Sequence, residues 1–201
     1  MVFSLIASVP IPSSRVDAGA DLRANPLMEE PDPIRPQEET FALDPASLAD
    51  AQLAFIGRIV SPWSRREDCP KNMGEARRRA CPAVILIAPA FRPALAGLVA
   101  GQWLHVLTWL GRARRDLAIQ MPRHASAPRG TFSLRSPVRP NPIGLHLVQI
   151  VALDVASGRI DIDGIDVLDA TAVLDLKPYL GSVDMPPAPS PTEPSIRGET
   201  A

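Results

Sequence analysis

Residues 145–163 read LHLVQIVALDVASGRIDID, and this stretch indicates how the folded part of the chain is built. Apolar and polar residues alternate partly over 145–153 and strictly over 159–163, which is the two-residue period of a half-buried β-strand. Between them lies Asp154-Val-Ala-Ser-Gly158, a run rich in turn-forming residues. Two such segments joined by a short turn predict a β-hairpin.

Other short apolar segments predict the rest of a sheet. Residues 83–88 (AVILIA) form a fully apolar run whose length suits a buried strand. Expected helices are few and short, at 74–80 and 93–100. The remaining expected strands are 54–60, 104–110, 117–121, 130–134 and 173–176. So many short strands favour an all-β barrel or sandwich, mainly antiparallel, over a parallel α/β sheet.

The two ends of the chain differ from its middle. Residues 1–50 carry three arginines, nine acidic residues and seven of the 23 prolines, and residues 185–201 carry five more prolines. Segments of this kind bury too little apolar surface to offset the entropy of ordering. We therefore expect 1–50 to be a disordered acidic tail with at most a short helix near 45–52. Residues 51–184 are expected to form one folded domain, and 185–201 a second disordered tail.

Several classes of protein are disfavoured. No apolar run reaches the roughly 18 residues of a membrane-spanning helix, and the apolar residues 1–12 lack the basic region of a signal peptide. The chain contains no glycine-rich nucleotide loop and no G-x-S-x-G nucleophile turn. Cys69 and Cys81 are the only cysteines, too few for a disulfide framework or a zinc site. Two reduced thiols in a cytoplasmic protein are expected.

The three histidines show no metal-binding spacing, so we expect no metal. His105 and His146 fall within expected strands, where a histidine is usually hydrogen-bonded or solvent-facing. His124 follows Arg123 in a basic loop.

Positive charge is concentrated between residues 58 and 139, with 15 basic and four acidic side chains. Nearly all are arginines, since Lys71 and Lys177 are the only lysines. The planar arginine fork suits phosphates and base stacking, so this region suggests a nucleic-acid surface. A solvated arginine-rich face explains the charge equally well.

Residues 128–145, PRGTFSLRSPVRPNPIGL, are the most informative for function. Their four prolines, Pro140-Asn141-Pro142 above all, favour one rigid loop shape. Arg135 and Arg139 would then be displayed on a stiff scaffold, which suits contacts to an anion or a ribose. The alternative is a rigid loop that only closes a barrel.

This stretch closely resembles PRGVFATRSPxRPNPIGL, the signature of the tRNA N6-threonylcarbamoyladenosine methyltransferase family. Residues 166–179 (DVLDATAVLDLKPY) are similar to the family's DxxDGTPVLDIKPY, residues 55–62 (FIGRIVSP) to its IGxIxSP, and residues 107–114 (LTWLGRAR) to its LYWF[HD]RAR. The four segments occur in family order and span roughly 54–181.

The resemblance implies a single antiparallel β-barrel that binds S-adenosylmethionine (SAM) without a Rossmann fold. It also implies a cytoplasmic homodimer with the cofactor near the subunit interface, and methyl transfer to N6 of threonylcarbamoyladenosine at tRNA position 37. This chain would be a short form that lacks the further C-terminal domain of longer members.

Site residues follow from the same resemblance. Catalytic candidates are Asp169, Tyr179 and Asn141, with none assigned as a general base. Expected cofactor contacts are Pro70, Lys71, Asn72, Gly111, Arg112, Arg135, Leu145, Asp166, Asp169, Ala170 and Thr171. The basic region between residues 58 and 139 supplies the expected RNA contacts, which are Arg112, Arg114, Arg115, Arg123, Arg129 and Arg139.

The chain departs from the family pattern at three places. Pro70-Lys71-Asn72 replaces P-R-Q, Gly111 replaces a histidine or aspartate, and Ala170 replaces the glycine of D-G-T-P. Alanine at 170 is disfavoured if the turn there needs a positive φ. These departures leave three alternatives open: a SAM-binding barrel without methyl transfer, an RNA-binding barrel without a cofactor, and a methyltransferase acting on a small metabolite.

Overall fold

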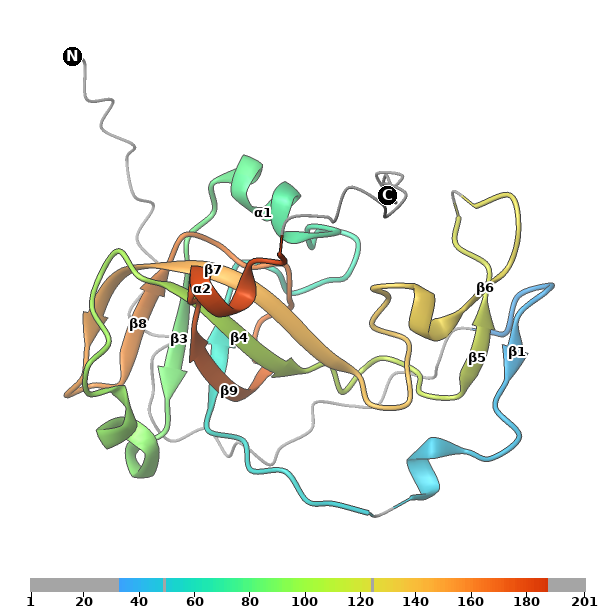
Figure 1. Cartoon of the computed structure of the whole chain (residues 1–201), viewed down its shortest axis with the longest axis horizontal. Coiled ribbons are helices and arrows are strands. Elements are labelled where there is room, and N and C mark those ends of the chain that lie inside the picture. Colours follow the sequence, from blue (N-terminus) through green and yellow to red (C-terminus); the bar gives the residue numbers. More distant parts are fainter. Residues whose placement is uncertain (1–32, 49, 124, 188–201) are drawn as a thin grey trace.

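Figure 1 shows a computed structural model of the chain, which describes residues 33–48, 50–123 and 125–187. Much of the two expected tails, residues 1–32 of 1–50 and 188–201 of 185–201, lies outside the described residues, as does His124. Six antiparallel strands close into a barrel in the order β2-β3-β8-β7-β4-β9, which confirms the antiparallel all-β prediction. Their bounds are β2 Gly57–Val60, β3 Ala83–Ile87, β4 Trp103–Trp109, β7 Ile143–Asp154, β8 Arg159–Ile162 and β9 Ala172–Pro178.

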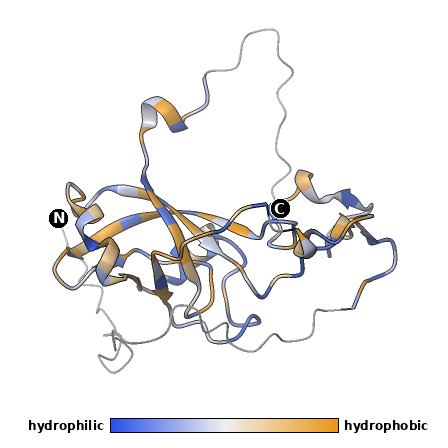
Figure 2. Ribbon diagram, turned by 90° about the horizontal axis from the view of Figure 1, so that it is seen from below, coloured by the Kyte–Doolittle hydropathy of each residue, from blue (hydrophilic) through white to orange (hydrophobic). Residues whose placement is uncertain are grey.

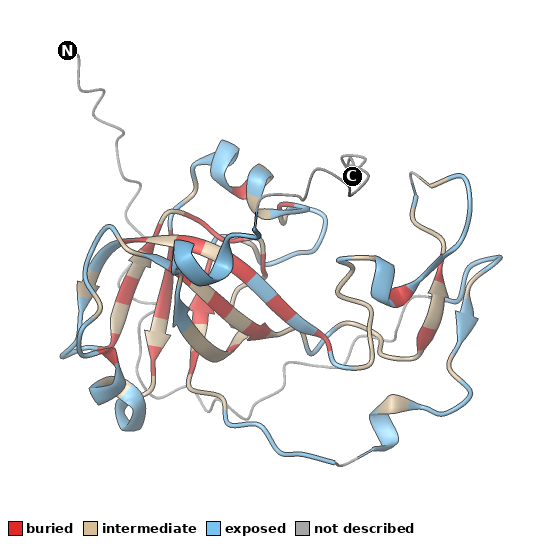
Figure 3. Cartoon of the chain, viewed as in Figure 1, coloured by how far each residue is buried: buried red, intermediate tan, exposed pale blue. Residues whose placement is uncertain are grey.

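The core lies inside the barrel, and alternation along the strands fills it. In β4 and in the first half of β7, every second residue is buried (Figure 3), so each strand has one inner and one outer face. Figure 2 accordingly shows hydrophobic and hydrophilic residues along the same strands. The largest fully buried side chains include Ile59, Ile85, Leu104, Ile150, Ile160 and Ile162.

The expected hairpin is β7–β8, and its strands are unequal in length. β8 pairs with the second half of β7, where Ile150 lies opposite Ile162, whereas β4 pairs with the first half, from Ile143 to Gln149. The first half of β7 therefore has a free edge beyond the end of β8. The chain that leaves β8 runs along this edge, because the Asp163 amide donates to the Gln149 carbonyl.

All connections that carry the signature segments leave the barrel at one end, which we call the mouth. Strands β2, β4 and β8 end there, and β3, β7 and β9 begin there, as the antiparallel pairings show. The mouth therefore receives three connections: residues 61–82, with helix α1 (Met73–Arg79), residues 110–142, and residues 163–171. The expected helix at 74–80 is confirmed as α1, whereas the helix expected at 93–100 is a 3-10 segment, η3, at Pro89–Leu95.

A second, three-stranded sheet lies outside the barrel, in the order β1-β5-β6 (Figure 1). It contains β1 Glu39–Thr40, β5 Leu117–Gln120 and β6 Arg129–Gly130. The strand expected at 117–121 therefore exists outside the barrel. The strand expected at 130–134 is wrong, because Thr131–Ser133 is a 3-10 turn, η4, in which the Thr131 hydroxyl donates to the Leu117 carbonyl at 2.6 Å.

The structure also differs from the expected boundary at residue 50. β1 pairs with β5, and the short helix expected near 45–52 is η2, a 3-10 turn at Pro45–Ser47. Secondary structure therefore begins before residue 50, and the strand that pairs with β1 lies some 80 residues further along the chain. The last element in the described residues is α2, at Gly181–Asp184. None of the helices in the described ranges is long and apolar enough to cross a membrane.

Candidate functional site

A buried chain of three polar side chains closes the barrel at the mouth. His146 lies on the inner face of β7 and contacts the inward-facing Thr108 of β4, with 2.9 Å between Nε2 and Oγ1. Its other ring nitrogen, Nδ1, lies 2.7 Å from Oδ1 of Asp166, in the connection from β8 to β9. The side chains of His146 and Asp166 are 6% and 16% exposed, and Thr108 is fully buried. Asp166 is therefore the member of this chain that reaches the surface.

Gly144, in the signature at 128–145, makes room for this arrangement. It is buried on the inner face of β7, two residues before His146. A Cβ atom at this position would lie under 3.0 Å from both His146 Nε2 and Thr108 Oγ1. No side chain fits there unless the hydrogen-bonded pair moves apart.

Asp169 fastens the same connection to the end of β2. Its carboxylate accepts a hydrogen bond from the Ser61 amide at 3.1 Å, and the Ser61 hydroxyl donates to the Val167 carbonyl at 2.9 Å. The next residue, Ala170, has a φ of +62°. The positive φ suspected from the family's glycine is thus confirmed at Ala170. Thr171 turns inward on its own loop, where its hydroxyl donates to the Leu168 carbonyl at 2.7 Å.

Cys69 lies in the connection from β2 to β3, and its thiol interacts electrostatically with the Asp166 carboxylate. Burial, and then the Asp166 carboxylate, raise the pKa of the Cys69 thiol to about 11. A thiol with this pKa is protonated at neutral pH and is a poor nucleophile. The polar groups of the mouth therefore do not include an activated cysteine at this position.

The Pro70-Lys71-Asn72 segment leads directly into α1. Asn72 is the N-cap of this helix, and its side-chain oxygen accepts from the Glu75 amide at 2.9 Å. Glu75 in turn accepts from the Lys71 amide at 2.9 Å, so the two residues hold the helix start. Pro70 is buried, and the Lys71 side chain is exposed. Lys71 and Asn72 are both exposed, but the asparagine oxygen is engaged in helix capping, which leaves Lys71 as the exposed cation of this segment.

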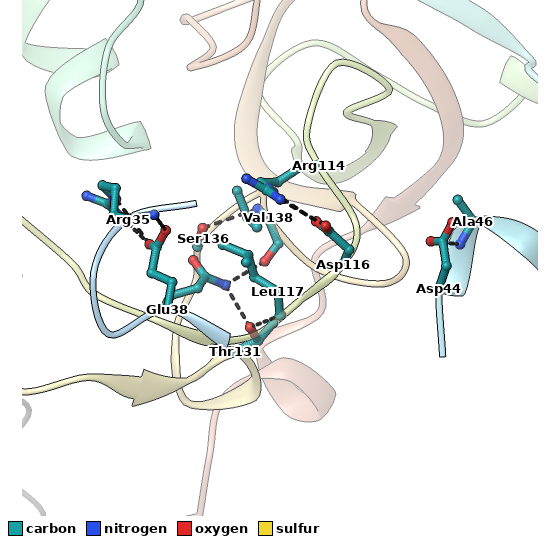
Figure 4. A network of polar contacts seen from close by, with 11 residues as sticks. Arg35, Glu38, Asp44, Ala46, Arg114, Asp116, Leu117, Thr131, Ser136 and Val138 are labelled. Atoms are coloured by element: carbon teal, nitrogen blue, oxygen red, sulfur yellow. Dashed lines mark hydrogen bonds and ion pairs between the residues drawn. The ribbon is translucent and has the colours of Figure 1, made fainter. Parts of the chain in front are cut away.

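Arg114, Arg115 and Arg139, all expected to bind RNA, make contacts within the chain that hold one connection together. Arg114 forms a two-point contact with Asp116, 2.8 Å for each nitrogen–oxygen pair (Figure 4). Arg115 donates to the Pro140 carbonyl at 2.6 Å and lies 5.6 Å from the centre of the Trp109 ring. Arg139 donates to two carbonyls of its own loop. Their guanidinium groups stabilise the residue 110–142 connection.

The other three expected RNA contacts, Arg112, Arg123 and Arg129, are exposed. Arg112 and Gly111 follow β4 directly and lie on the mouth side, as does the exposed Asn141 before β7. Arg135 lies near the start of β7, with 3.5 Å between Nη2 and the Leu145 carbonyl, and Leu145 itself is exposed on the outer face.

The structure separates the catalytic candidates. Asp169 precedes the start of β9, whereas Tyr179 follows its end and donates its amide to the Trp103 carbonyl at 2.8 Å. The seven residues of β9 put roughly 20 Å between the two ends of the strand. Tyr179 instead lines an open groove of about 320 Å³ on the outer wall, together with Arg77, Trp103 and Leu147. Asp169 and Tyr179 of one chain therefore do not share a site.

Sequence reasoning missed Thr108, His146 and Ser61. The signal for His146 was available, because it lies in register with Gly144, Val148 and Ile150 on the face that proved to be buried. A histidine on an inner face needs a polar partner. What the sequence did not show is that Asp166, twenty residues later, supplies that partner.

A closed antiparallel barrel with polar residues gathered at one end defines a class distinct from the Rossmann-type nucleotide-binding proteins. The tRNA-methyltransferase O N-terminal domain family matches residues 58–185, more than half of the chain, and the chain belongs to this family. The probable SAM-binding protein VirR of Rhizobium radiobacter is 37% identical over 145 residues, which cover 72% of this chain and 79% of VirR. The tRNA (adenine(37)-N6)-methyltransferase of Mus musculus is 44% identical over 76 residues, 38% of this chain and 17% of the mouse protein.

Solved structures agree with the fold. The crystal structure of TrmO from Pseudomonas aeruginosa has a TM-score of 0.53 and 28% identity, over 68% of this chain and 59% of that one. A second TrmO crystal structure has a TM-score of 0.56 and 26% identity, over 74% of this chain and 66% of that one. The chain thus spans less than two thirds of these TrmO chains.

Proposed function

We propose that this chain is a SAM-dependent methyltransferase that acts on N6 of adenine 37 in tRNA, with threonylcarbamoyladenosine as the leading substrate. Membership of the TrmO family supports this, as do the names of its relatives as SAM-binding proteins and as tRNA (adenine(37)-N6)-methyltransferases. The observation that carries the proposal is that the connections containing the signature segments leave one end of one barrel, around Asp166.

The chemistry of the mouth suits the cofactor. SAM has an α-ammonium group and two ribose hydroxyls, which can donate hydrogen bonds to a protein carboxylate. It also has a carboxylate of its own, which a protein cation can bind. Asp166 supplies a partly exposed carboxylate, and Lys71 and Arg112 supply exposed cations on connections at the same end. When bound, SAM supplies an activated methyl group on a sulfonium, so the protein mainly has to orient the acceptor nitrogen.

The RNA surface of this proposal rests on the exposed arginines. Arg112 and Arg123 precede and follow β5 in the chain and are exposed, so they can contact phosphates, which dominate affinity for RNA. Arg114 and Arg115 keep that connection in shape. We therefore assign phosphate contacts to Arg112 and Arg123, and a supporting role to Arg114, Arg115 and Arg139.

The proposal includes a homodimer in the cytoplasm, where tRNA is available. Ile143, Leu145 and Val151 are exposed hydrophobic residues on β7, and a second copy would cover such a surface. In a dimer, Tyr179 of one copy could approach the mouth of the other, which the length of β9 forbids within one chain. Light scattering after size exclusion measures the mass, and a monomer at working concentration would contradict this part.

The test of the proposed function has two steps. The purified chain is titrated with SAM by calorimetry, and the same sample is then incubated with methyl-labelled SAM and tRNA bearing threonylcarbamoyladenosine. Saturable binding and label in the tRNA are expected. Tests of the RNA surface use Arg112→Glu and Arg123→Glu, which should weaken tRNA binding in a salt-dependent manner. Absence of SAM binding would refute the proposal.

A second candidate is a SAM-binding protein that does not transfer methyl groups. It is favoured by Asn72, whose side-chain oxygen caps α1 where the family pattern has a glutamine. SAM binding with no label in any tRNA, and no tRNA binding for Arg123→Glu to weaken, would support this candidate.

A further inference from the structure

The contacts of His146 favour one tautomer of its neutral ring. An ionised carboxylate only accepts hydrogen bonds, so the 2.7 Å contact with Asp166 places a proton on Nδ1. Nε2 of the neutral ring is then an acceptor, and the Thr108 hydroxyl donates to it at 2.9 Å. In this tautomer of the neutral ring, donation runs along the whole chain, from Thr108 to His146 to Asp166.

The chain has one exposed end and one buried end. Thr108 is fully buried in the barrel wall, and His146 is nearly so, which leaves Asp166 at the surface of the mouth. Oδ1 of Asp166 faces the ring, and among the described residues no hydrogen bond is formed with the other oxygen, Oδ2. The carboxylate is thus held by one oxygen and has the second available.

A purely structural role accounts poorly for this arrangement. A barrel end can be closed by apolar side chains, and replacing a buried hydrogen-bonded pair by apolar groups of the same shape is often nearly neutral. Here three polar groups are lined up, and a glycine at position 144 leaves the space they need. Such an arrangement fixes the rotamer of a carboxylate, as expected for a group that has to meet a ligand in one orientation.

We propose that His146 is a positioning residue, which together with Thr108 holds the Asp166 carboxylate so that Oδ2 binds SAM through its α-ammonium group or its ribose hydroxyls. This inference rests on the proposed function. His146 and Thr108 act through Asp166 and do not touch the cofactor themselves. Nothing in the family signature marks His146 beyond its position two residues after Gly144.

The test compares SAM dissociation constants measured by calorimetry. His146→Leu removes the donor to Asp166, and we expect SAM to bind about ten- to a hundredfold more weakly, the loss associated with a hydrogen bond to a charged group. His146→Asn keeps an N–H near the position of Nδ1 and should restore most of the affinity. In the transfer assay, His146→Leu should raise KM for SAM more than it lowers kcat.

A matched control separates positioning from loss of stability. Thr131→Val removes a buried threonine hydroxyl hydrogen bond in η4, and Thr108→Val removes the one to His146. Both are expected to lower stability, but only Thr108→Val should weaken SAM binding. Adding His146→Leu to Asp166→Asn should weaken SAM binding no further than Asp166→Asn alone, because His146 acts only through that carboxylate.

A spectroscopic measurement tests the proton position without the cofactor. In the chain labelled with nitrogen-15, long-range correlation of the His146 ring should show a proton on Nδ1 and none on Nε2. An unprotonated Nδ1, or unchanged SAM affinity in His146→Leu while the unmodified chain binds SAM, would overturn the inference. If the unmodified chain fails to bind SAM, the proposed function falls and this inference falls with it.

Discussion

Replacing Gly144 by alanine is the sharpest test of the packing at the mouth. The added Cβ would lie under 3.0 Å from His146 Nε2 and Thr108 Oγ1 and 3.1 Å from His146 Cε1, whereas ordinary contacts are 3.4–4 Å. Both side chains are buried on paired strands, so neither has room to turn away. Overpacking and a weakened hydrogen bond together should lower the free energy of unfolding by about 2–4 kcal/mol.

The control is a glycine of the same signature. Gly130 has a φ of −62°, and a Cβ there would meet nothing within 4 Å. Gly130→Ala should therefore stay within about 0.5 kcal/mol of the unmodified chain or stabilise it slightly. Unfolding in urea, followed by tryptophan fluorescence and extrapolated linearly, measures both variants. A Gly144→Ala variant as stable as Gly130→Ala would refute the reasoning.

Three further changes test other parts of the structure. Ala170→Gly should raise the free energy of unfolding by about 0.5–1 kcal/mol, because glycine relieves the φ of +62°; a lower stability in urea would contradict the strain. Hydrogen bonds from the Arg114 guanidinium keep the pKa of Asp116 below its ordinary value, although burial opposes this. The ionised carboxylate therefore stabilises the fold above about pH 4, and this stabilisation is lost as the pH falls through the lowered pKa. Asp116→Asn should thus be less stable by up to about 1 kcal/mol at pH 7, and the gap should close in acid; a gap independent of pH speaks against the pair. In Cys81→Ser, alkylation of Cys69 followed by mass spectrometry should be slow at pH 7 and accelerate toward pH 11, and rapid alkylation at pH 7 would show that its thiol is not held protonated.

The barrel strands could be predicted because their side-chain period is a local property. The alternation over 145–153 and the apolar run over 83–88 became β7 and β3 with ends shifted by at most two residues. The second sheet could not be predicted in the same way. Its strand β5 pairs with β1 at Glu39–Thr40, and composition alone assigned those residues to a disordered tail. Which strand a segment pairs with depends on contacts distant in sequence, so short two-residue strands leave no local signal.

The candidate site likewise has one part that depends on local sequence and one that depends on distant contacts. A glycine in the family pattern was enough to suspect a positive φ at Ala170, since φ is a property of one residue. The environment of His146 depends on the register between β4 and β7 and on the path of residues 163–171 across the free edge of β7. Neither is visible in the residues next to the histidine. For this reason the sequence did not reveal that His146 contacts the Asp166 carboxylate at the mouth.

Charge was the least specific of the sequence signals, and the structure indicates why. Arg112, Arg114 and Arg115 are near neighbours in the chain and equal in charge, yet only Arg112 among them is exposed. Arg114 binds Asp116, and Arg115 is held by a carbonyl and an indole ring, so their forks have partners that are not phosphates. Substituting all three together, as charge alone suggests, would remove these internal contacts and the proposed RNA contact at once. Only a comparison of Arg112→Glu with Arg115→Lys, each with its stability measured, separates an RNA contact from a residue that shapes the loop around it.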